Sequence, residues 1–251
     1  MNPYELSTRE ICAIDGIDIK TAQAIHKYRH FKYGETQVKR YQEKNINLVS
    51  YWDDNYPVLL KKIYDAPVML YTIGNPLSKK EDMVSIVGTR TMTQYGRSIT
   101  RMIVKKLVES KITTLSGLAR GVDTATHRET VNMGGRTIAV LGCGLDIVYP
   151  SENKKLFKDI LTNGTIISEF ALGEKPDRKN FPQRNRIIAG LSHGTVVVEA
   201  GNKSGSILTA FNAIDQNRDV FAVPGRITDL MSVGTNRLIR HGAFPVFDGE
   251  E

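Results

Sequence analysis

The chain has 251 residues, with 41% hydrophobic and 24% charged side chains and a formal net charge of +7. This composition excludes a disordered chain, and the excess of Lys and Arg indicates either an anionic partner such as nucleic acid or a generally basic surface. Two distant cysteines exclude a Cys-rich zinc site or a disulfide framework, and no apolar run approaches a membrane span or signal-peptide core, so we expect a cytoplasmic protein.

Residues 1–45 are predicted to form a separate helical unit. Apolar residues at helical spacing flank residues 15–18, and two short helices joined by such a glycine-containing turn resemble a helix-hairpin-helix or SAM-like unit. A turn of this kind can bind DNA phosphates through backbone N–H groups, although two short helices more often only pack together. Residues 49–54 indicate a bridge into the main domain, which we place at 46–251.

From about residue 66, short β-branched or apolar runs alternate with amphipathic helical stretches. Strands are predicted at 68–72, 83–87, 112–116, 137–141, 165–168, 195–199 and 220–223. This alternation predicts an α/β fold with a doubly wound, mainly parallel sheet. In such sheets, ligands bind at the carboxyl ends of the strands.

Two glycine-containing turns, Gly88–Arg90 and Ser116–Gly121, follow predicted strands. Glycine lets a ligand approach the backbone, and Arg90 would reach a phosphate, although it could instead pair with a carboxylate. The second turn suits backbone donors that surround a phosphate, or it is simply a tight turn. Its candidate contacts are Ser116, Gly117, Arg120 and Gly121.

Asp123 and His127 lie four residues apart on the next predicted helix, where such a pair could touch and take part in catalysis. An Asp near a helix start more often caps it, and we favour structural support for both. Glu199 ends a predicted strand and could be a general base, but we favour a structural role there too. Beyond it, Lys203–Ser206 begins a helix whose N–H groups could receive a phosphate.

Residues 175–186 carry five cations and one acid. We interpret Phe181 as a stacking platform for a base, worth about 1–3 kcal/mol for any base, although the ring could instead anchor this segment to the core. The segment is predicted to be a Pro-interrupted turn before a short apolar helix. On that turn Arg184 is expected to face phosphate, and Arg186 to pair with Glu199.

Several catalytic signatures are missing. The chain has no Walker A sequence, no Gly-x-Ser-x-Gly elbow and no His-Glu-x-x-His motif, and residues 142–144 lack the third glycine of a dinucleotide fingerprint. The His-x-Glu at 127–129 has no Pro-Cys-x-x-Cys to complete a deaminase zinc site. We therefore expect no catalysis, no cofactor and no metal.

Many motifs follow one another along the chain: Gly88–Arg90 with Tyr95-Gly96, Ser116–Asp123 with His127, Gly142–Asp146 with Tyr149-Pro150, Asn180–Arg186, Glu199-Ala200, Ser204–Ser206, Thr209-Ala210, Ala222–Gly225, and Gly234–Asn236 with Gly242-Ala243. In this order they resemble the DNA-processing protein A (DprA/Smf) family over roughly residues 46–247. The resemblance implies an extended Rossmann-like domain that binds single-stranded DNA, works as a homodimer and loads the RecA recombinase onto incoming strands during natural transformation, without catalysis.

Carried to this chain, the resemblance implies a DNA-binding set: Arg90, Ser116, Gly117, Arg120, Gly121, Lys179, Asn180, Phe181, Arg184, Asn185, Lys203, Ser204, Gly205 and Ser206. The structural supports of that set would be Asp123, His127, Arg186 and Glu199. The dimer interface is expected near Leu230, Met231, Val233 and Leu238, although this stripe could equally be core. The chain stops soon after Phe247, so we expect no winged-helix-like domain of the kind some members carry.

Two alternatives stay open. A Rossmann-like hydrolase of nucleoside monophosphates would use Glu199 in its reaction, but the Pro-Gly-Gly turn of that family is not found here. A duplex-DNA binder would instead act through the helices of residues 1–45.

Overall fold

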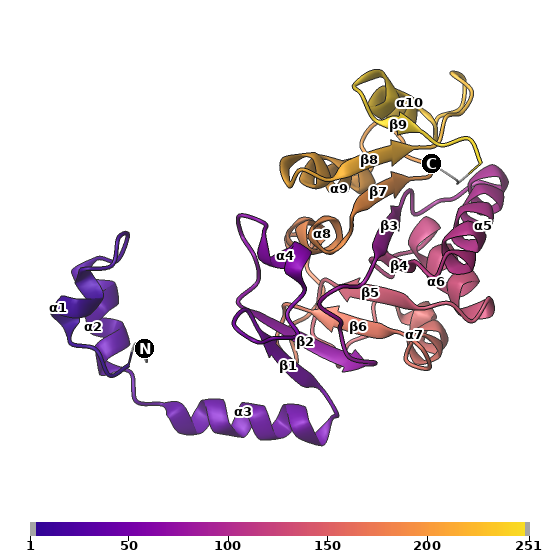
Figure 1. Cartoon of the computed structure of the whole chain (residues 1–251). Coiled ribbons are helices and arrows are strands. Elements are labelled where there is room, and N and C mark those ends of the chain that lie inside the picture. Colours follow the sequence, from indigo (N-terminus) through magenta and orange to yellow (C-terminus); the bar gives the residue numbers. More distant parts are fainter. Residues whose placement is uncertain (1–3, 249–251) are drawn as a thin grey trace. The chain divides into compact units, whose positions relative to one another are not determined.

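The computed structural model describes residues 4–248, and its contacts divide the chain into one unit at 1–45 and a second at 46–251 (Figure 1). The first unit consists of α1 (Thr8–Cys12), α2 (Ile19–Lys27) and α3 (Phe31–Glu43). A capping box between Ser7 and Glu10 begins α1. Gly16, with φ of 84°, forms the turn between α1 and α2.

The start of α2 is occupied by a carboxylate. The side chain of Asp18 accepts a hydrogen bond of 2.7 Å from the backbone N–H of Thr21. A phosphate bound to this turn would compete with that carboxylate for the same N–H groups and be repelled by its charge. The structure therefore favours the interpretation of α1 and α2 as a packed hairpin over the DNA-binding one.

The second unit is built on one nine-stranded sheet in the order β1-β2-β6-β5-β4-β3-β7-β8-β9. The strands are β1 (Asn47–Ser50), β2 (Met69–Gly74), β3 (Met83–Val87), β4 (Thr113–Ser116), β5 (Thr137–Leu141), β6 (Thr165–Ser168), β7 (Gly194–Val197), β8 (Asp219–Ala222) and β9 (Phe244–Pro245). β1 and β2 are antiparallel to their neighbours, and all other pairs are parallel. The predicted doubly wound, mainly parallel α/β fold is confirmed.

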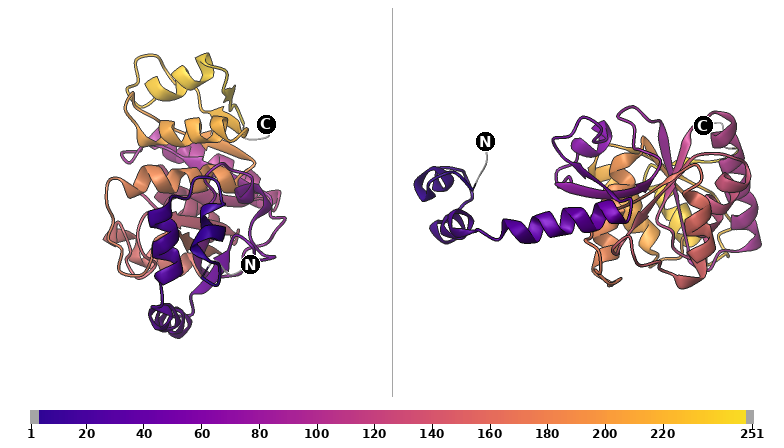
Figure 2. Two further views of the ribbon diagram at one scale, coloured as in Figure 1. Left: turned by 90° about the vertical axis from the view of Figure 1, so that its left-hand side faces the viewer. Right: turned by 90° about the horizontal axis from the view of Figure 1, so that it is seen from below.

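Helices cover both faces of the sheet (Figures 1 and 2). One face carries α5 (Gln94–Glu109), α6 (Val122–Asn132) and α7 (Lys154–Ile160), the last preceded by a 3₁₀ turn at Ser151–Asn153. The other carries α4 (Val58–Lys61), α8 (Asn180–Leu191) and α9 (Gly205–Asp215), with α10 (Val233–Arg240) packed beside β8. No helix among residues 4–248 is long and apolar enough to cross a membrane.

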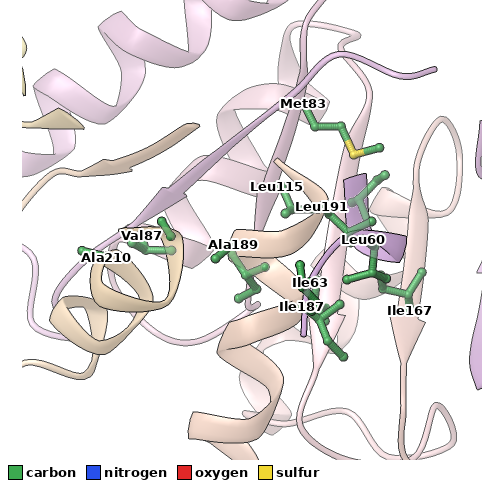
Figure 3. Packing of buried hydrophobic residues seen from close by; sticks show 14 of the residues in the cluster. Leu60, Ile63, Met83, Val87, Leu115, Ile167, Ile187, Ala189, Leu191 and Ala210 are labelled. Atoms are coloured by element: carbon green, nitrogen blue, oxygen red, sulfur yellow. The ribbon is translucent and has the colours of Figure 1, made fainter. Parts of the chain in front are cut away.

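α8 is the central helix of the second face. Its residues Ile187, Ala189 and Leu191 lie in the main core cluster, which also contains Leu60 and Ile63 from the α4 segment (Figure 3). Each fully buried aliphatic side chain of this kind contributes about 1.5–3 kcal/mol relative to an exposed one. Because the C-terminal half of α8 is fixed in the core, its first turns are held over the carboxyl ends of the parallel strands.

The segment predicted as a turn is part of α8. The helix begins at Asn180, so Phe181 and Arg184 are helical. Pro182 sits in the first turn, where its missing N–H would have had no intrahelical partner in any case. The proline therefore starts this helix and does not interrupt it.

Candidate functional site

A pocket of about 780 Å³ opens at the carboxyl edge of the sheet, between the facing sides of α8 and α9. The α8 residues Phe181, Asn185 and Ile188 line the pocket together, because their spacing of four and three residues places them on one side of the helix. The remaining lining comes from the loops that follow the strands β3 to β8, from the start of α6 and from the first turns of α9. It includes Thr89, Arg90, Asp123, Tyr149, Arg178, Lys203, Ser204, Gly205, Ser206, Leu208, Thr209 and Met231.

Phe181 and Arg90 are brought together as the sequence predicts. Phe181 is half-buried on the pocket wall, and the guanidinium carbon of exposed Arg90 lies 5.6 Å from its ring centroid. The ring of Tyr149 lies 5.8 Å from that of Phe181, tilted by 33°. Two aromatic rings and a cation on one wall suit a ligand that carries both a flat ring and a negative charge.

The start of α9 forms the opposite wall. The hydroxyl of Ser204 accepts from the backbone N–H of Ser206 at 3.4 Å and so caps the helix, and exposed Lys203 precedes it. The first turn of this eleven-residue helix has no acid. Its remaining N–H groups and its dipole favour an anion in the pocket.

Arg184 is not the exposed phosphate contact that the sequence predicts, because it lies largely buried at the base of the pocket, with its guanidinium carbon 5.9 Å from the ring centroid of Phe181. Its side chain is 4% exposed and donates hydrogen bonds to the carbonyls of Gly117, at 2.7 Å, and Val140. Arg184 is the fifth residue of the helix that begins at Asn180, and its side chain points toward the sheet at the base of the pocket, not along the exposed rim. Burial lowers the pKa of this guanidinium, and the neighbouring Asp123 carboxylate opposes the shift. Arg184 therefore ties α8 to the ends of β4 and β5.

Two further members of the expected DNA-binding set are structural. Asn180 is 1% exposed, and its amide donates to the carbonyls of Gly142 and Lys175 at 3.3 and 3.4 Å. Ser116 is fully buried, and its hydroxyl donates to the carbonyl of Ile86 at 2.6 Å. Neither polar group is exposed to a ligand.

Asp123 and His127 are both buried but have different partners. The Asp123 carboxylate accepts from the backbone N–H groups of Gly117 and Ala119 at 3.1 and 3.3 Å. Burial raises its pKa, opposed first by the charge of Arg184 and then by these amides. Nδ1 of His127 lies 2.7 Å from the hydroxyl of Thr137. Burial, followed by the charge of Arg184, lowers the pKa of His127 to about 3, so the ring is neutral at physiological pH.

The turn at 116–121 is shaped by close packing. Leu118 adopts the left-handed conformation with φ of 55° while fully buried. Gly121 has φ of 74°, and a Cβ atom there would overlap the carbonyl oxygen of Thr89. Gly117 and Arg120 line a small hollow that shares Arg90, Tyr149 and Phe181 with the main pocket, but neither of them lines the main pocket itself. Arg120 is exposed and forms a bidentate pair with Glu152 at 2.6 and 2.8 Å.

Arg186 and Glu199 do not pair, which corrects a second expectation. Arg186 contacts Asp65 at 3.0 Å and Glu169, because it lies on the side of α8 that faces away from the pocket. Glu199 accepts hydrogen bonds from the backbone N–H of Thr93, at 2.9 Å, and from its hydroxyl. Arg186 and Glu199 thus both have structural contacts, as the sequence predicts, but their partners differ from the predicted ones.

The residues expected at a dimer interface have separate positions. Leu238 is 5% exposed and belongs to the core cluster, so it cannot contact another protein. Met231 lines the pocket, whereas Leu230 and Val233 are exposed. Other exposed apolar side chains on α9 and β9 line a second pocket of about 510 Å³: Phe211, Ile214 and Phe244.

Several residues of the pocket were not predicted from the sequence, among them Thr89, Tyr149 and Arg178. Tyr149 and Arg178 line it, and Lys179, which was expected there, is exposed outside the lining. Thr89 is buried beside Arg90. An exposed Tyr between a glycine-containing turn and a proline was a usable signal for Tyr149. The choice between Arg178 and Lys179 depends on where α8 begins, which the sequence does not fix.

Comparison with known proteins gives a consistent result. The family model described as DNA recombination-mediator protein A matches residues 47–251. The DNA processing protein DprA of Streptococcus pneumoniae is 41% identical over 228 residues, which cover 91% of this chain and 80% of that protein. Protein Smf of Synechocystis is 44% identical over 211 residues, which cover 82% of this chain but only 53% of that protein.

Two solved structures share the fold at appreciable identity. The crystal structure of DprA from S. pneumoniae superposes with a TM-score of 0.86 and 37% identity, covering 98% of this chain and 85% of that one. A structure of DNA processing protein A from Helicobacter pylori, whose subject is the single-stranded DNA binding mode of that protein, gives a TM-score of 0.73 and 30% identity, covering 82% of this chain and 92% of that one.

Proposed function

The chain belongs to the DNA recombination-mediator protein A family, and on that premise we propose that it binds single-stranded DNA in the pocket between α8 and α9. A role in DNA processing follows from the family. The observation that carries the finer proposal is the position of Arg90, Phe181 and Lys203 around one pocket that is also lined by a helix start. A base stacked on Phe181 would place its phosphates between Arg90 and the N-terminus of α9.

The chemistry of the pocket favours unpaired DNA over duplex. Stacking on an exposed aromatic ring needs a base whose face is free, and it contributes about 1–3 kcal/mol per base without sequence preference. Four exposed cations lie at or beside the pocket: Arg90, Arg178, Lys179 and Lys203. If each neutralises one phosphate, the slope of log K against log salt is about −3 for a single strand.

The pocket acts by binding and leaves the strand chemically intact. Glu199, the acid that a nucleotide hydrolase would use, already accepts two hydrogen bonds from Thr93 and lies outside the pocket lining. A general base must accept a proton from water or substrate, and both oxygens here face Thr93. Incubation with AMP tests this point, because release of free adenine would establish the hydrolase alternative.

In the cell, the protein would protect incoming single strands in the cytoplasm and load RecA onto them during natural transformation, as a homodimer. The support for protein partners is the exposed apolar surface formed by Phe211, Ile214 and Phe244. Light scattering with chromatography tests the dimer: Phe211→Glu is expected to convert it to a monomer. A mass of one chain for the unmodified protein would contradict the dimer.

Fluorescence anisotropy with single- and double-stranded oligonucleotides tests the binding proposal. We expect preference for the single strand, and Phe181→Ala is expected to weaken binding to oligo(dT), oligo(dC) and oligo(dA) by a similar factor of about 5–150, the equivalent of one stacked base. Arg90→Ala is expected to reduce the magnitude of the salt slope by about 0.7. Unchanged affinity of both variants would contradict the assignment of the pocket.

A further inference from the structure

A second group of cations lies outside the pocket, on the face of the sheet covered by α5, α6 and α7. Its members are exposed, and none forms an ion pair with another residue between 4 and 248: Arg128 of α6 and Lys154, Lys155 and Lys158 of α7. We call these four residues the α7 surface. Nothing in the binding site described above uses them.

The start of α7 is anchored to the turn that adjoins the pocket. The amide of Asn153, directly before α7, donates to the carbonyl of Leu118 at 3.0 Å and to the hydroxyl of Thr124 at 2.8 Å. These bonds fix the start of α7 against the turn at 116–121. Tyr149, which is 44% exposed and lines the pocket, lies five residues before Lys154 in the sequence. A strand that left the pocket past Tyr149 toward this anchored start of α7 would meet Lys154 and Lys155.

The helix α7 begins with two cations, although the dipole of an isolated helix favours acidic residues at that end. Lys154 and Lys155 occupy its first turn, which contains no acid. The nearby acids are Asp159 on α7 and Glu152, and Glu152 is paired with Arg120. A bound polyanion would remove this mutual repulsion, and a solvated surface with no ligand would not.

We infer that the α7 surface binds the phosphates of the same single strand that occupies the pocket, and so extends the DNA site beyond it. This inference rests on the proposed function. Lys154 and Lys158 lie four residues apart on one side of the helix, about 6 Å along its axis. That spacing matches about two phosphates of a stacked strand at 3.4 Å each.

Glu152 pairs with Arg120, so a phosphate would have to compete with the Glu152 carboxylate for this arginine. Its bidentate pair with Arg120 is exposed, with both side chains more than half accessible, so the pair is weak and exchanges with solvent. A phosphate between the pocket and α7 would take the place of the Glu152 carboxylate. Removing that carboxylate should therefore strengthen binding, which a purely structural role for the pair would not produce.

The test compares oligo(dT) of about 5 nucleotides, which fills the pocket alone, with oligo(dT) of about 20 nucleotides, which is long enough to reach α7. For the long strand, Lys154→Ala/Lys158→Ala is expected to weaken binding about 5–10-fold at low salt and to reduce the magnitude of the salt slope by about 1.4. The short strand should bind this variant as it binds the unmodified protein. Glu152→Gln should bind the long strand about 2–5-fold more tightly.

A control variant loses two lysines elsewhere, one of which, Lys79, pairs with exposed Asp54 at 2.9 Å. Lys79 and Lys80 lie between β2 and β3, at the amino ends of the parallel strands and so at the edge opposite the pocket. Lys79→Ala/Lys80→Ala should leave binding of both strands unchanged. If the unmodified protein binds neither strand, the proposed function and this inference both fall. If it binds both, and the α7 variant behaves like this control, only the α7 surface is refuted.

Discussion

Replacing Arg184 by Ala distinguishes a structural cation from a DNA contact. The change leaves the Asp123 carboxylate buried without its compensating charge, and it removes a donor from the carbonyls of Gly117 and Val140. Asp123 and Arg184 form no direct ion pair, but removing one of two opposite buried charges leaves the other desolvated without compensation, at a cost of up to about 3–5 kcal/mol. We therefore expect Arg184→Ala to lower the free energy of unfolding by about that amount.

Urea unfolding followed by far-UV circular dichroism measures the effect. With a slope of about 2–3 kcal/mol per molar urea, the midpoint should fall by about 1–2 M. The double variant Asp123→Ala/Arg184→Ala should recover part of the loss, with a coupling energy of about 1–3 kcal/mol, because it removes the stranded carboxylate. Arg90→Ala is the control, since its exposed side chain should leave the midpoint almost unchanged.

The DNA-binding readout completes this test. Below its unfolding transition, Arg184→Ala should show the same salt slope as the unmodified protein, because a buried guanidinium releases no counterion when DNA binds. The reasoning would be refuted by a variant that loses less than about 1 kcal/mol of stability and whose salt slope shrinks by about 0.7, since that pair of results identifies a phosphate contact.

Three further predictions concern the supports of the site. In the folded protein His127 has a pKa of about 3, whereas in the unfolded chain it has its ordinary pKa of 6.5 and takes up a proton below that pH. The free energy of unfolding should therefore fall by about 1.4 kcal/mol for each unit that the pH is lowered between 6 and 4. His127→Gln should lose this pH dependence in urea titrations. Gly96→Ala would place a Cβ atom on the Glu199 carboxylate, and this overlap should cost about 1–3 kcal/mol of stability, more than the gain of about 1 kcal/mol in helix propensity. A raised melting temperature would contradict this prediction. Leu238→Ala should cost about 2–5 kcal/mol as a core truncation, whereas exposed Leu230→Ala should cost under about 0.5 kcal/mol; equal losses in urea would show that the two share one environment.

The sheet was largely predictable because its central strands are buried on both faces. The runs at 83–87, 137–141 and 165–168 are observed with the same bounds, since parallel strands under two layers of helices must be continuously apolar. The strands β1 and β9 were not predicted, because they are not buried on both faces. Both lie at edges of the sheet and are short, so neither needs an apolar run to form.

The sequence predicted where the site lies, but not which of its residues face the pocket and which are buried supports. Arg90 and Phe181 meet because strand ends of a doubly wound sheet converge, which depends only on topology. Whether Arg184 faces solvent depends on the rotational phase of α8, and that phase is set by where Ile187 and Leu191 enter the core. A proline in the first turn concealed the start of the helix, so the phase could not be read from the sequence.

The link between α8 and the ends of β4 and β5 has a kinetic consequence. Arg184, Asp123 and Asn180 already fix the walls of the pocket, so if a strand binds there as proposed, we expect no rearrangement of these walls before it enters. Encounter should then be limited by diffusion and accelerated by the basic rim, with association rates that fall steeply as ionic strength rises. Residence time, in contrast, should depend mainly on how slowly a base slides off the ring of Phe181.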